Sequence, residues 1–281
     1  MQKLTSIAEL RAWLARERSH GHTMGLVPTM GALHSGHMAL VESARAHCDR
    51  VVLSIFVNPR QFGPGEDFDA YPRDLAGDCA LAEAHGVDAV FAPPTEEMYP
   101  HAAGPLIVAG RQANILCGAS RPGHFDGVLQ VVCKLFNLVQ PERAFFGQKD
   151  AQQVAIIQTF VRDYNLPLAI EVIPVVREPD GLAKSSRNVY LGAEERAAAP
   201  AIHAALQLCR AQLQAGQTPA AALQAARAHL AQHLPQGRID YFELLAWPDL
   251  LPLAQGTRQC IALAAVHLGR TRLIDNITFE S

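Results

Sequence analysis

The chain has 281 residues, which is enough for about two domains of ordinary size. Hydrophobic residues make up 49% of it and charged residues 18%, a balance typical of a globular protein with a full core. The net charge of −3 and the pI near 6.4 give no reason to expect a nucleic acid as partner, since such binders usually carry a basic surface. No run of about 18 apolar residues predicts a membrane span.

The six cysteines are scattered and form no CxxC pair. This pattern indicates small core residues in a reducing compartment and disfavours a disulfide or zinc framework. The N-terminal stretch is charged and amphipathic, and it lacks the apolar segment of a signal peptide. We therefore expect a cytoplasmic protein.

Short apolar runs alternate with amphipathic stretches through the first half of the chain. The runs have the length of β-strands and lie at residues 24–29, 51–57, 88–92 and 143–146. Stretches with helical spacing lie between them, at 37–48, 74–85 and 126–139. This alternation predicts an α/β fold, a Rossmann-like parallel sheet with helices on both faces. In such sheets, ligands bind beyond the carboxyl ends of the strands.

The character of the sequence changes near residue 174. A turn-rich stretch leads into Ala-rich helical sequence at 193–214, in which Pro200 is expected to kink or restart the helix. Thr218 and Pro219 then follow the pattern of a helix N-cap with proline at the first helical position.

Two strand-like runs follow this helical sequence, at residues 238–245 and 260–268. Strands after a run of helices favour an α+β arrangement. We therefore predict two domains: residues 1–174, which hold the Rossmann-like sheet, and residues 175–281, a smaller C-terminal α+β domain.

The first motif with chemical content is PTMGALHSGHMAL, residues 28–40, between an apolar strand and an amphipathic helix. Gly31 and Gly36 permit a tight turn and close approach of the backbone to a ligand. The start of the helix offers backbone N–H groups and about half a positive charge, which favour phosphate oxygens. His34 and His37 can donate to phosphate charge that grows during a reaction. Two other interpretations stay open: surface histidines beside a cap, or half of a metal site.

The second motif, FVNPRQF at residues 56–62, follows the second strand. Asn58 and Gln61 are neutral polar groups that can bond hydroxyl and carboxylate oxygens without a competing charge. The alternative is an Asn-Pro turn with exposed amides.

The third motif is GQKDAQQ, residues 147–153, where a glycine turn again opens a helix. Lys149 is a compact charge suited to phosphate. Asp150 can orient that lysine, bond a ribose hydroxyl or cap the helix, and a solvated turn with a capping aspartate is the alternative interpretation.

The fourth motif is VREPDGLAKSSRN, residues 176–188. Proline, Asp-Gly and paired serines predict a mobile loop. Its hydroxyls and guanidinium groups can close over a triphosphate and match its charge. A flexible linker between domains is the alternative.

The four motifs together carry a resemblance to a known family. His34-Ser35-Gly36-His37 resembles the HIGH motif of the nucleotidyltransferase superfamily. A more specific resemblance, to the pantothenate synthetase family, is carried by PTMGALHSGH, FVNPRQF, GQKDAQQ and DGLAKSSRN. The last of these resembles a counterpart of the superfamily's KMSKS loop. The resemblance covers about residues 24–276, with the motifs in the family's order.

The resemblance implies a reaction and its substrates. ATP would activate the carboxylate of pantoate as pantoyl adenylate, and β-alanine would then displace AMP to give pantothenate. Mg²⁺ is expected with ATP, held mainly by phosphates and water, so no protein ligand is named. The resemblance implies no tightly bound organic cofactor. It also implies that the protein is a homodimer.

The resemblance also assigns roles to residues. Residues 1–174 would bind nucleotide and pantoate, and residues 175–281 would carry the loop that closes over ATP. The catalytic residues would be His34, His37 and Lys149. The pantoate and β-alanine site would be formed by Gln61, Gln153, Asn58 and Met30. The ATP site would comprise Met30, Gly31, Ala32, Leu33, His34, Ser35, Gly36, His37, Gly147, Gln148, Lys149, Asp150, Val176, Lys184, Ser185, Ser186 and Arg187.

Three further features complete the sequence interpretation. Lys184 departs from the family pattern, which has an apolar residue there, and it either adds a cation near the phosphates or points into solvent. Arg121 and His124 either approach the site or serve in capping and loop packing. GRTRLIDN, residues 269–276, is interpreted as structural.

The sequence disfavours two rival functions. A nucleotidylyltransferase acting on a phosphate ester would have the same HxGH turn, but FVNPRQF, GQKDAQQ and the SSRN loop argue against it. A nucleotide-binding sensor without turnover would also bind ATP, but the histidines with Lys149 argue against it.

Overall fold

The computed structural model describes residues 1–101 and 104–280. The chain forms two compact units. The first unit comprises Met1–Gly147 and Ile156–Ile173, and the second comprises Gln148–Ala155 and Pro174–Ser281. In the described part of the chain, no helix combines the length and the apolar character that a bilayer crossing demands.

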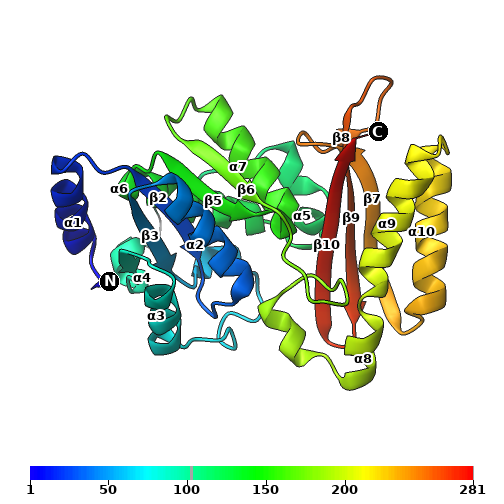
Figure 1. Ribbon diagram of the computed structural model, residues 1–281, viewed down its shortest axis with the longest axis horizontal. Helices are drawn as coiled ribbons and strands as arrows, with labels where there is room; N and C mark the ends of the chain where they lie inside the picture. The colour runs from blue at the N-terminus through cyan, green and yellow to red at the C-terminus, as the bar shows by residue number, and fades with distance from the viewer. Residues whose placement is uncertain (102–103, 281) are drawn as a thin grey trace. The chain divides into compact units, whose positions relative to one another are not determined.

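The first unit is built on a six-stranded parallel sheet (Figure 1). The strand order is β1-β4-β3-β2-β5-β6. The strands are β1 (Gln2–Leu4), β2 (Met24–Thr29), β3 (Arg50–Ile55), β4 (Ala89–Phe91), β5 (Arg143–Gly147) and β6 (Ala169–Ile173). The four strands expected from the sequence are confirmed, and β1 and β6 are additional edge strands.

Helices cover both faces of this sheet, as the alternation of elements predicted. The helices that begin in the first unit are α1 (Ile7–Ser19), α2 (Ser35–His47), α3 (Leu75–Ala84), α4 (Thr95–Met98), α5 (Cys117–Ser120) and α6 (His124–Val139). Phe145 joins the core that α2 and α3 form with the sheet, whereas its neighbour Phe146 contacts Phe136 of α6 on the other face. Adjacent residues of a strand point to opposite faces, so β5 alone shows that both faces are covered.

The strand order reverses between β2 and β5. From β2 the chain proceeds through β3 to β4 on one side, and it returns to the other side of β2 with β5 and β6. Such a reversal is where open α/β sheets bind ligands, beyond the carboxyl ends of the strands. The first motif begins in the last two residues of β2, and the GQKD motif begins at the last residue of β5.

The second unit has a four-stranded antiparallel sheet in the order β10-β9-β7-β8. The strands are β7 (Gly237–Ala246), β8 (Leu251–Pro252), β9 (Gln259–Leu268) and β10 (Thr271–Glu280). The predicted strands appear as β7 and β9. The sequence interpretation missed β8 and β10.

Helices of the second unit follow the predicted breaks. Helix α8 (Ala193–Ala198) ends before Pro200, and α9 (Ala201–Gln214) restarts directly after it. Thr218 caps α10 (Pro219–His233), because its side chain accepts the Ala221 N–H. Helix α7 (Ala151–Asp163) starts in the second unit and ends in the first.

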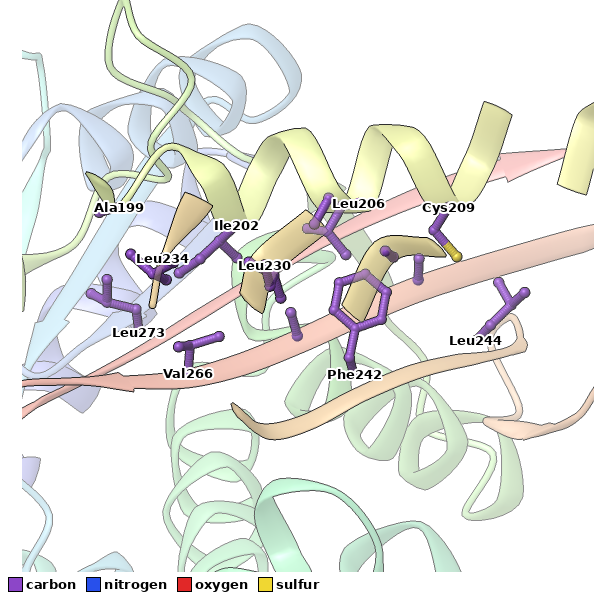
Figure 2. Close-up of a cluster of buried hydrophobic side chains, with 14 of the residues drawn as sticks. Ala199, Ile202, Leu206, Cys209, Leu230, Leu234, Phe242, Leu244, Val266 and Leu273 are labelled. Atoms are coloured by element: carbon purple, nitrogen blue, oxygen red, sulfur yellow. The ribbon is translucent and has the colours of Figure 1, made fainter. Parts of the chain in front are cut away.

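Helices α9 and α10 bury one face of the antiparallel sheet. Figure 2 shows Phe242 of β7 pointing from the sheet toward the helices, with Leu206 of α9 and Leu230 of α10 above it. These side chains are at most 1% exposed. This core includes Leu273 and Phe279 of β10 and so fixes that strand against the helices.

Candidate active site

The histidines of the first motif form the start of α2. His34 is the N-cap residue, with φ −145° and ψ 176°. Its Nδ1 accepts a hydrogen bond from the Gly36 N–H (3.0 Å), and the His37 Nδ1 accepts one from the His34 N–H (3.2 Å). The ring centroids are 4.1 Å apart. The two imidazoles are therefore held together at the carboxyl end of β2.

These bonds assign the tautomer of both rings. A ring nitrogen that accepts from a backbone N–H carries no proton, so in each neutral ring the proton lies on Nε2. Each ring thus presents Nε2–H as its donor, which suits an anion. The backbone N–H groups expected to serve this purpose are used inside the cap, because those of Gly36, His37 and Met38 all donate to His34.

The glycine turn before α2 is held by a buried carboxylate that the sequence interpretation did not identify. Asp78 of α3 is 6% exposed and accepts the N–H groups of Ala32 (2.9 Å) and Leu33 (2.7 Å). Gly31 has a φ of +84°, and a Cβ there would lie 2.8 Å from the Asp78 carboxylate. The N–H groups of Ala32 and Leu33 therefore stabilise the turn itself.

The second motif forms a buried amide pair at the end of β3. Asn58 is the N-cap residue of the short helix η1 (Pro59–Gln61), and it is 1% exposed. The Asn58 Nδ2 donates to the Gln61 Oε1 (2.9 Å) and to the Gly127 carbonyl (3.0 Å). Its Oδ1 accepts from the Arg60 N–H (3.2 Å) and the Tyr99 hydroxyl (2.9 Å).

These contacts separate the roles expected for the two amides. Asn58 uses both donors and both acceptor positions on protein groups, so its side chain orients Gln61. The backbone partners of Asn58 determine which way its side-chain amide is oriented. Because its Nδ2 then points to Gln61, the Gln61 atom that faces Asn58 must be the acceptor Oε1. The Gln61 Nε2 then faces Met30, whose sulfur lies 3.3 Å away and is a weak acceptor. Gln61 is thus set to offer a donor to a better acceptor.

Tyr99 completes this cluster on the side away from Gln61. Burial raises the pKa of Tyr99 to about 12, so the hydroxyl stays protonated and donates to Asn58. The Arg60 guanidinium lies over its ring, 4.1 Å from the centroid. Neither contact could be anticipated from the FVNPRQF motif alone.

The third motif continues from Gly147, the last residue of β5, into the short helix η3 (Gln148–Asp150). Gln148 is buried, Lys149 is half-buried and Asp150 is exposed. The Lys149 Nζ lies 3.8 Å from the Asp150 Oδ1, which fits the expected orienting role of Asp150 as an ion pair. Gln153 lies half-buried in the first turn of α7.

The fourth motif has more internal structure than a linker would. The Lys184 N–H donates to the Val176 carbonyl (2.9 Å), and the Glu178 N–H donates to the Leu182 carbonyl (2.8 Å). These bonds close a tight hairpin. The Lys184 Nζ lies 3.6 Å from the Glu178 Oε2, so an acidic neighbour already accompanies the extra cation.

The serines and arginine of this motif follow the hairpin. Ser185 caps the short helix η4 (Ser186–Tyr190) by accepting the Arg187 N–H at 3.2 Å. Asn188 donates to the Ala183 carbonyl (3.1 Å), which ties the helix back to the hairpin. Ser186 and Arg187 are half-buried.

Two further sequence features have structural partners. Arg121 forms an ion pair with Glu66, and the His124 Nδ1 lies 2.8 Å from the Gln61 carbonyl oxygen. Both therefore stabilise the loop around Gln61. Among the residues that the structure describes, no three His, Cys, Asp or Glu side chains gather as a metal site.

Polar residues of β10 were missed because the GRTRLIDN segment was interpreted only as structural. Asp275 and Asn276 are 5% and 2% exposed. The signal available in the sequence was the pair Asp275-Asn276 directly after the apolar residues Leu273 and Ile274, since polar groups next to an apolar run require partners if they are buried.

Comparisons with known proteins agree over the whole chain. The family model described as pantoate-beta-alanine ligase matches residues 2–278. A pantothenate synthetase of Lysinibacillus sphaericus is 61% identical over 279 residues, covering 99% of this chain and 98% of the relative. A crystal structure of pantothenate synthetase from Thermus thermophilus has a TM-score of 0.92 at 47% identity, with 99% of both chains covered.

A second solved structure adds ligands to the comparison. It is the pantoate-beta-alanine ligase of Francisella tularensis, described as complexed with beta-gamma ATP and beta-alanine. Its TM-score is 0.77 at 31% identity, with 99% of this chain and 97% of that chain covered. On the whole-length family match and these relatives, the chain belongs to the pantoate–β-alanine ligase family.

Proposed function

We propose that this chain is an ATP-dependent ligase that joins pantoate to β-alanine and forms pantothenate. The observation that carries the proposal is the position of two family motifs at the reversal of strand order. The histidine turn follows β2, and the GQKD turn follows the adjacent strand β5. Parallel strands end at the same edge, where nucleotides bind in such sheets.

The reaction requires activation because a carboxylate is a poor electrophile. A pantoate carboxylate oxygen attacks the α-phosphorus of ATP, and the bond to pyrophosphate breaks. The amine of β-alanine then attacks the acyl carbon of pantoyl adenylate, AMP leaves, and the amine loses a proton. No covalent bond to the protein is needed, so the side chains act by positioning and by stabilising charge.

The side chains divide this work. The Nε2–H groups of His34 and His37 donate to phosphate oxygens as negative charge shifts toward pyrophosphate. Lys149 supplies a full positive charge to the same phosphates. The Gln61 amide, oriented by Asn58, donates to a hydroxyl or carboxylate oxygen of pantoate, and Gln153 binds the same substrate.

The remaining predicted residues complete the ATP site. Ser185, Ser186 and Arg187 bind the triphosphate from the loop that follows the hairpin. Gly147, where nothing lies within 4 Å of an added Cβ, lets the backbone approach the nucleotide, whereas Gly31 and Gly36 shape the turn that holds the histidines. Mg²⁺ accompanies ATP and neutralises phosphate charge, with phosphates and water as its main ligands. By the family resemblance we infer a cytoplasmic protein that forms a homodimer. Analytical ultracentrifugation of the purified protein would test the homodimer.

Exchange of pyrophosphate into ATP tests the first half-reaction. We expect exchange only when pantoate is present, because the adenylate must form before pyrophosphate can return. Lys149→Ala should lower kcat/KM by about a hundredfold or more, since one phosphate contact in the transition state contributes ~3 kcal/mol. His37→Ala should behave similarly.

His229→Ala is the matched control, because this histidine lies on α10 outside the motifs. It should leave exchange unchanged. Near-normal exchange in folded Lys149→Ala would contradict the role of that lysine. Exchange that depends on a phosphate ester would favour a nucleotidylyltransferase, and ATP binding without AMP release in the presence of pantoate and β-alanine would favour a sensor.

A further inference from the structure

Strand β10 has two consecutive buried polar residues whose contacts the proposed chemistry does not use. Adjacent residues on a strand point to opposite faces. Asn276 contacts the Gln148–Lys149 turn, and Asp275 contacts Arg177 at the base of the hairpin in the fourth motif. The two polar residues of one strand therefore hold two different segments that carry predicted ATP-binding residues.

The contact of Asn276 with the lysine turn uses its whole side-chain amide. The Asn276 Nδ2 donates to the Gln148 carbonyl (2.9 Å) and to the Lys149 carbonyl (3.0 Å). Its Oδ1 accepts from the Gln148 Nε2 (3.1 Å). Asn276 is 2% exposed and Gln148 is 8% exposed, so water competes little for these bonds. The backbone on either side of the Lys149 Cα is thus fixed by one residue of β10.

Asp275 holds the other segment through an ion pair with two hydrogen bonds. Its carboxylate accepts from the Arg177 Nη1 (2.6 Å) and Nη2 (2.9 Å), and it also accepts the Asn276 N–H (2.7 Å). Arg177 then donates to the Gly181 carbonyl within the hairpin (3.0 Å) and to the Asn276 carbonyl (3.2 Å). Charge-assisted bonds of this kind are strong and directional.

We propose that Asn276 is a positioning residue that places Lys149 for phosphate binding, and that Asp275 and Arg177 tie the following loop to the same strand. This inference rests on the proposed function, because it assigns to Asn276 an effect that acts through Lys149. Asn276 itself does not touch substrate. A displacement of about 1 Å in a catalytic group can cost up to about a hundredfold in rate, so the amide controls activity without taking part in the chemistry.

Asn276→Asp is the sharpest test because it keeps the size of the side chain. It replaces the two N–H donors with an oxygen that faces two carbonyl oxygens, so the lysine turn must move. We expect pantoate-dependent pyrophosphate exchange to fall at least about tenfold, with the KM for pantoate unchanged. Asn276→Ser keeps one hydrogen-bond donor, so its pyrophosphate exchange should fall less than that of Asn276→Asp. The melting temperature of each variant would report on folding.

The matched control is Thr271→Val on the same strand. Thr271 is 4% exposed, and its hydroxyl has no hydrogen-bond partner among the described residues. The Thr271→Val variant should leave pyrophosphate exchange unchanged. This result would show that substitution of a buried residue in β10 does not by itself lower activity.

A double-mutant cycle separates positioning from a general loss of structure. If Asn276 acts through Lys149, adding Asn276→Asp to Lys149→Ala should lower the residual exchange by less than about threefold. Additive losses would overturn the proposal, as would full activity of Asn276→Asp in a folded protein. Absence of exchange in the unmodified protein would instead refute the proposed function.

Discussion

Gly36 shows how a single hydrogen atom in place of a side chain can position His34, a histidine that we propose to be catalytic. A Cβ at this position would lie 2.8 Å from the His34 Cε1 and 2.9 Å from its Nδ1. The His34 ring can therefore accept the Gly36 N–H only because residue 36 is glycine. The glycine that suggested close backbone approach to a ligand in the sequence has this second, local function.

Gly36→Ala should separate activity from stability. Alanine favours a helix over glycine by up to about 1 kcal/mol, and loss of the His34 cap costs about the same, so the melting temperature should change little. The added methyl group should displace the His34 ring and lower kcat for pantoate-dependent exchange by about tenfold or more. Gly110→Ala is the control, since nothing lies within 4 Å of a Cβ there. Unchanged kcat in Gly36→Ala would show that the ring position is not important.

At the scale of secondary structure, helix α6 supports the FVNPRQF motif, which we propose to bind pantoate. Gly127 lies where α6 crosses η1, and its carbonyl accepts from Asn58. A Cβ on Gly127 would overlap the Arg60 carbonyl and lie 2.7 Å from the Gln61 Cα. The close approach of helix and turn therefore depends on this glycine.

Gly127→Ala should push η1 away from α6 and with it the Gln61 amide. Overpacking of this kind costs about 1–3 kcal/mol, so we expect a lower melting temperature. The KM for pantoate should rise more than the KM for ATP, because Gln61 is the affected residue. Steady-state kinetics with each substrate varied would measure both. Asn137→Ala, at an exposed position of the same helix, should change neither constant.

The elements that the sequence predicted well are those with a strong apolar signal. Strands β2 and β5 and helix α6 have continuous or periodic buried faces. Strand β6 was missed because it is only half-buried, and β10 because polar residues interrupt it. The motifs indicated His34 and Gln61, but Asp78 comes from a distant helix, and only the folded chain shows what it contacts.

At the scale of the molecule, ionic contacts join segments that lie far apart in the sequence. In the first unit, Glu17 of α1 accepts hydrogen bonds from Arg50 of β3 (2.8 Å) and from Arg16 (3.0 Å). His22 also lies 3.1 Å from its carboxylate. Glu17 is 8% exposed, whereas the side chains of Arg50 and Arg16 are 31% and 50% exposed, so water screens the contact with Arg50 less than the one with Arg16.

These contacts predict how stability changes in acid. The hydrogen bond from Arg50 is the largest cause, and with those from Arg16 and His22 it lowers the pKa of Glu17 from 4.5 to about 2. The ionised carboxylate therefore contributes its stabilisation above pH 4.5, and this is lost as the pH falls from about 4.5 through about 2. We expect Glu17→Gln to lower the free energy of unfolding by about 1–3 kcal/mol at pH 7.

Urea unfolding at several pH values would measure this effect. The difference between Glu17→Gln and the unmodified protein should shrink as the pH falls below 4.5, because protonation makes the native glutamate neutral as well. Glu96→Gln, at an exposed position of α4, should show no such dependence. The difference in free energy of unfolding between Glu17→Gln and the unmodified protein could instead stay constant down to about pH 2. That result would mean that the charge of Glu17 does not stabilise the fold and that the amide changes only the shape of the contact with Arg50.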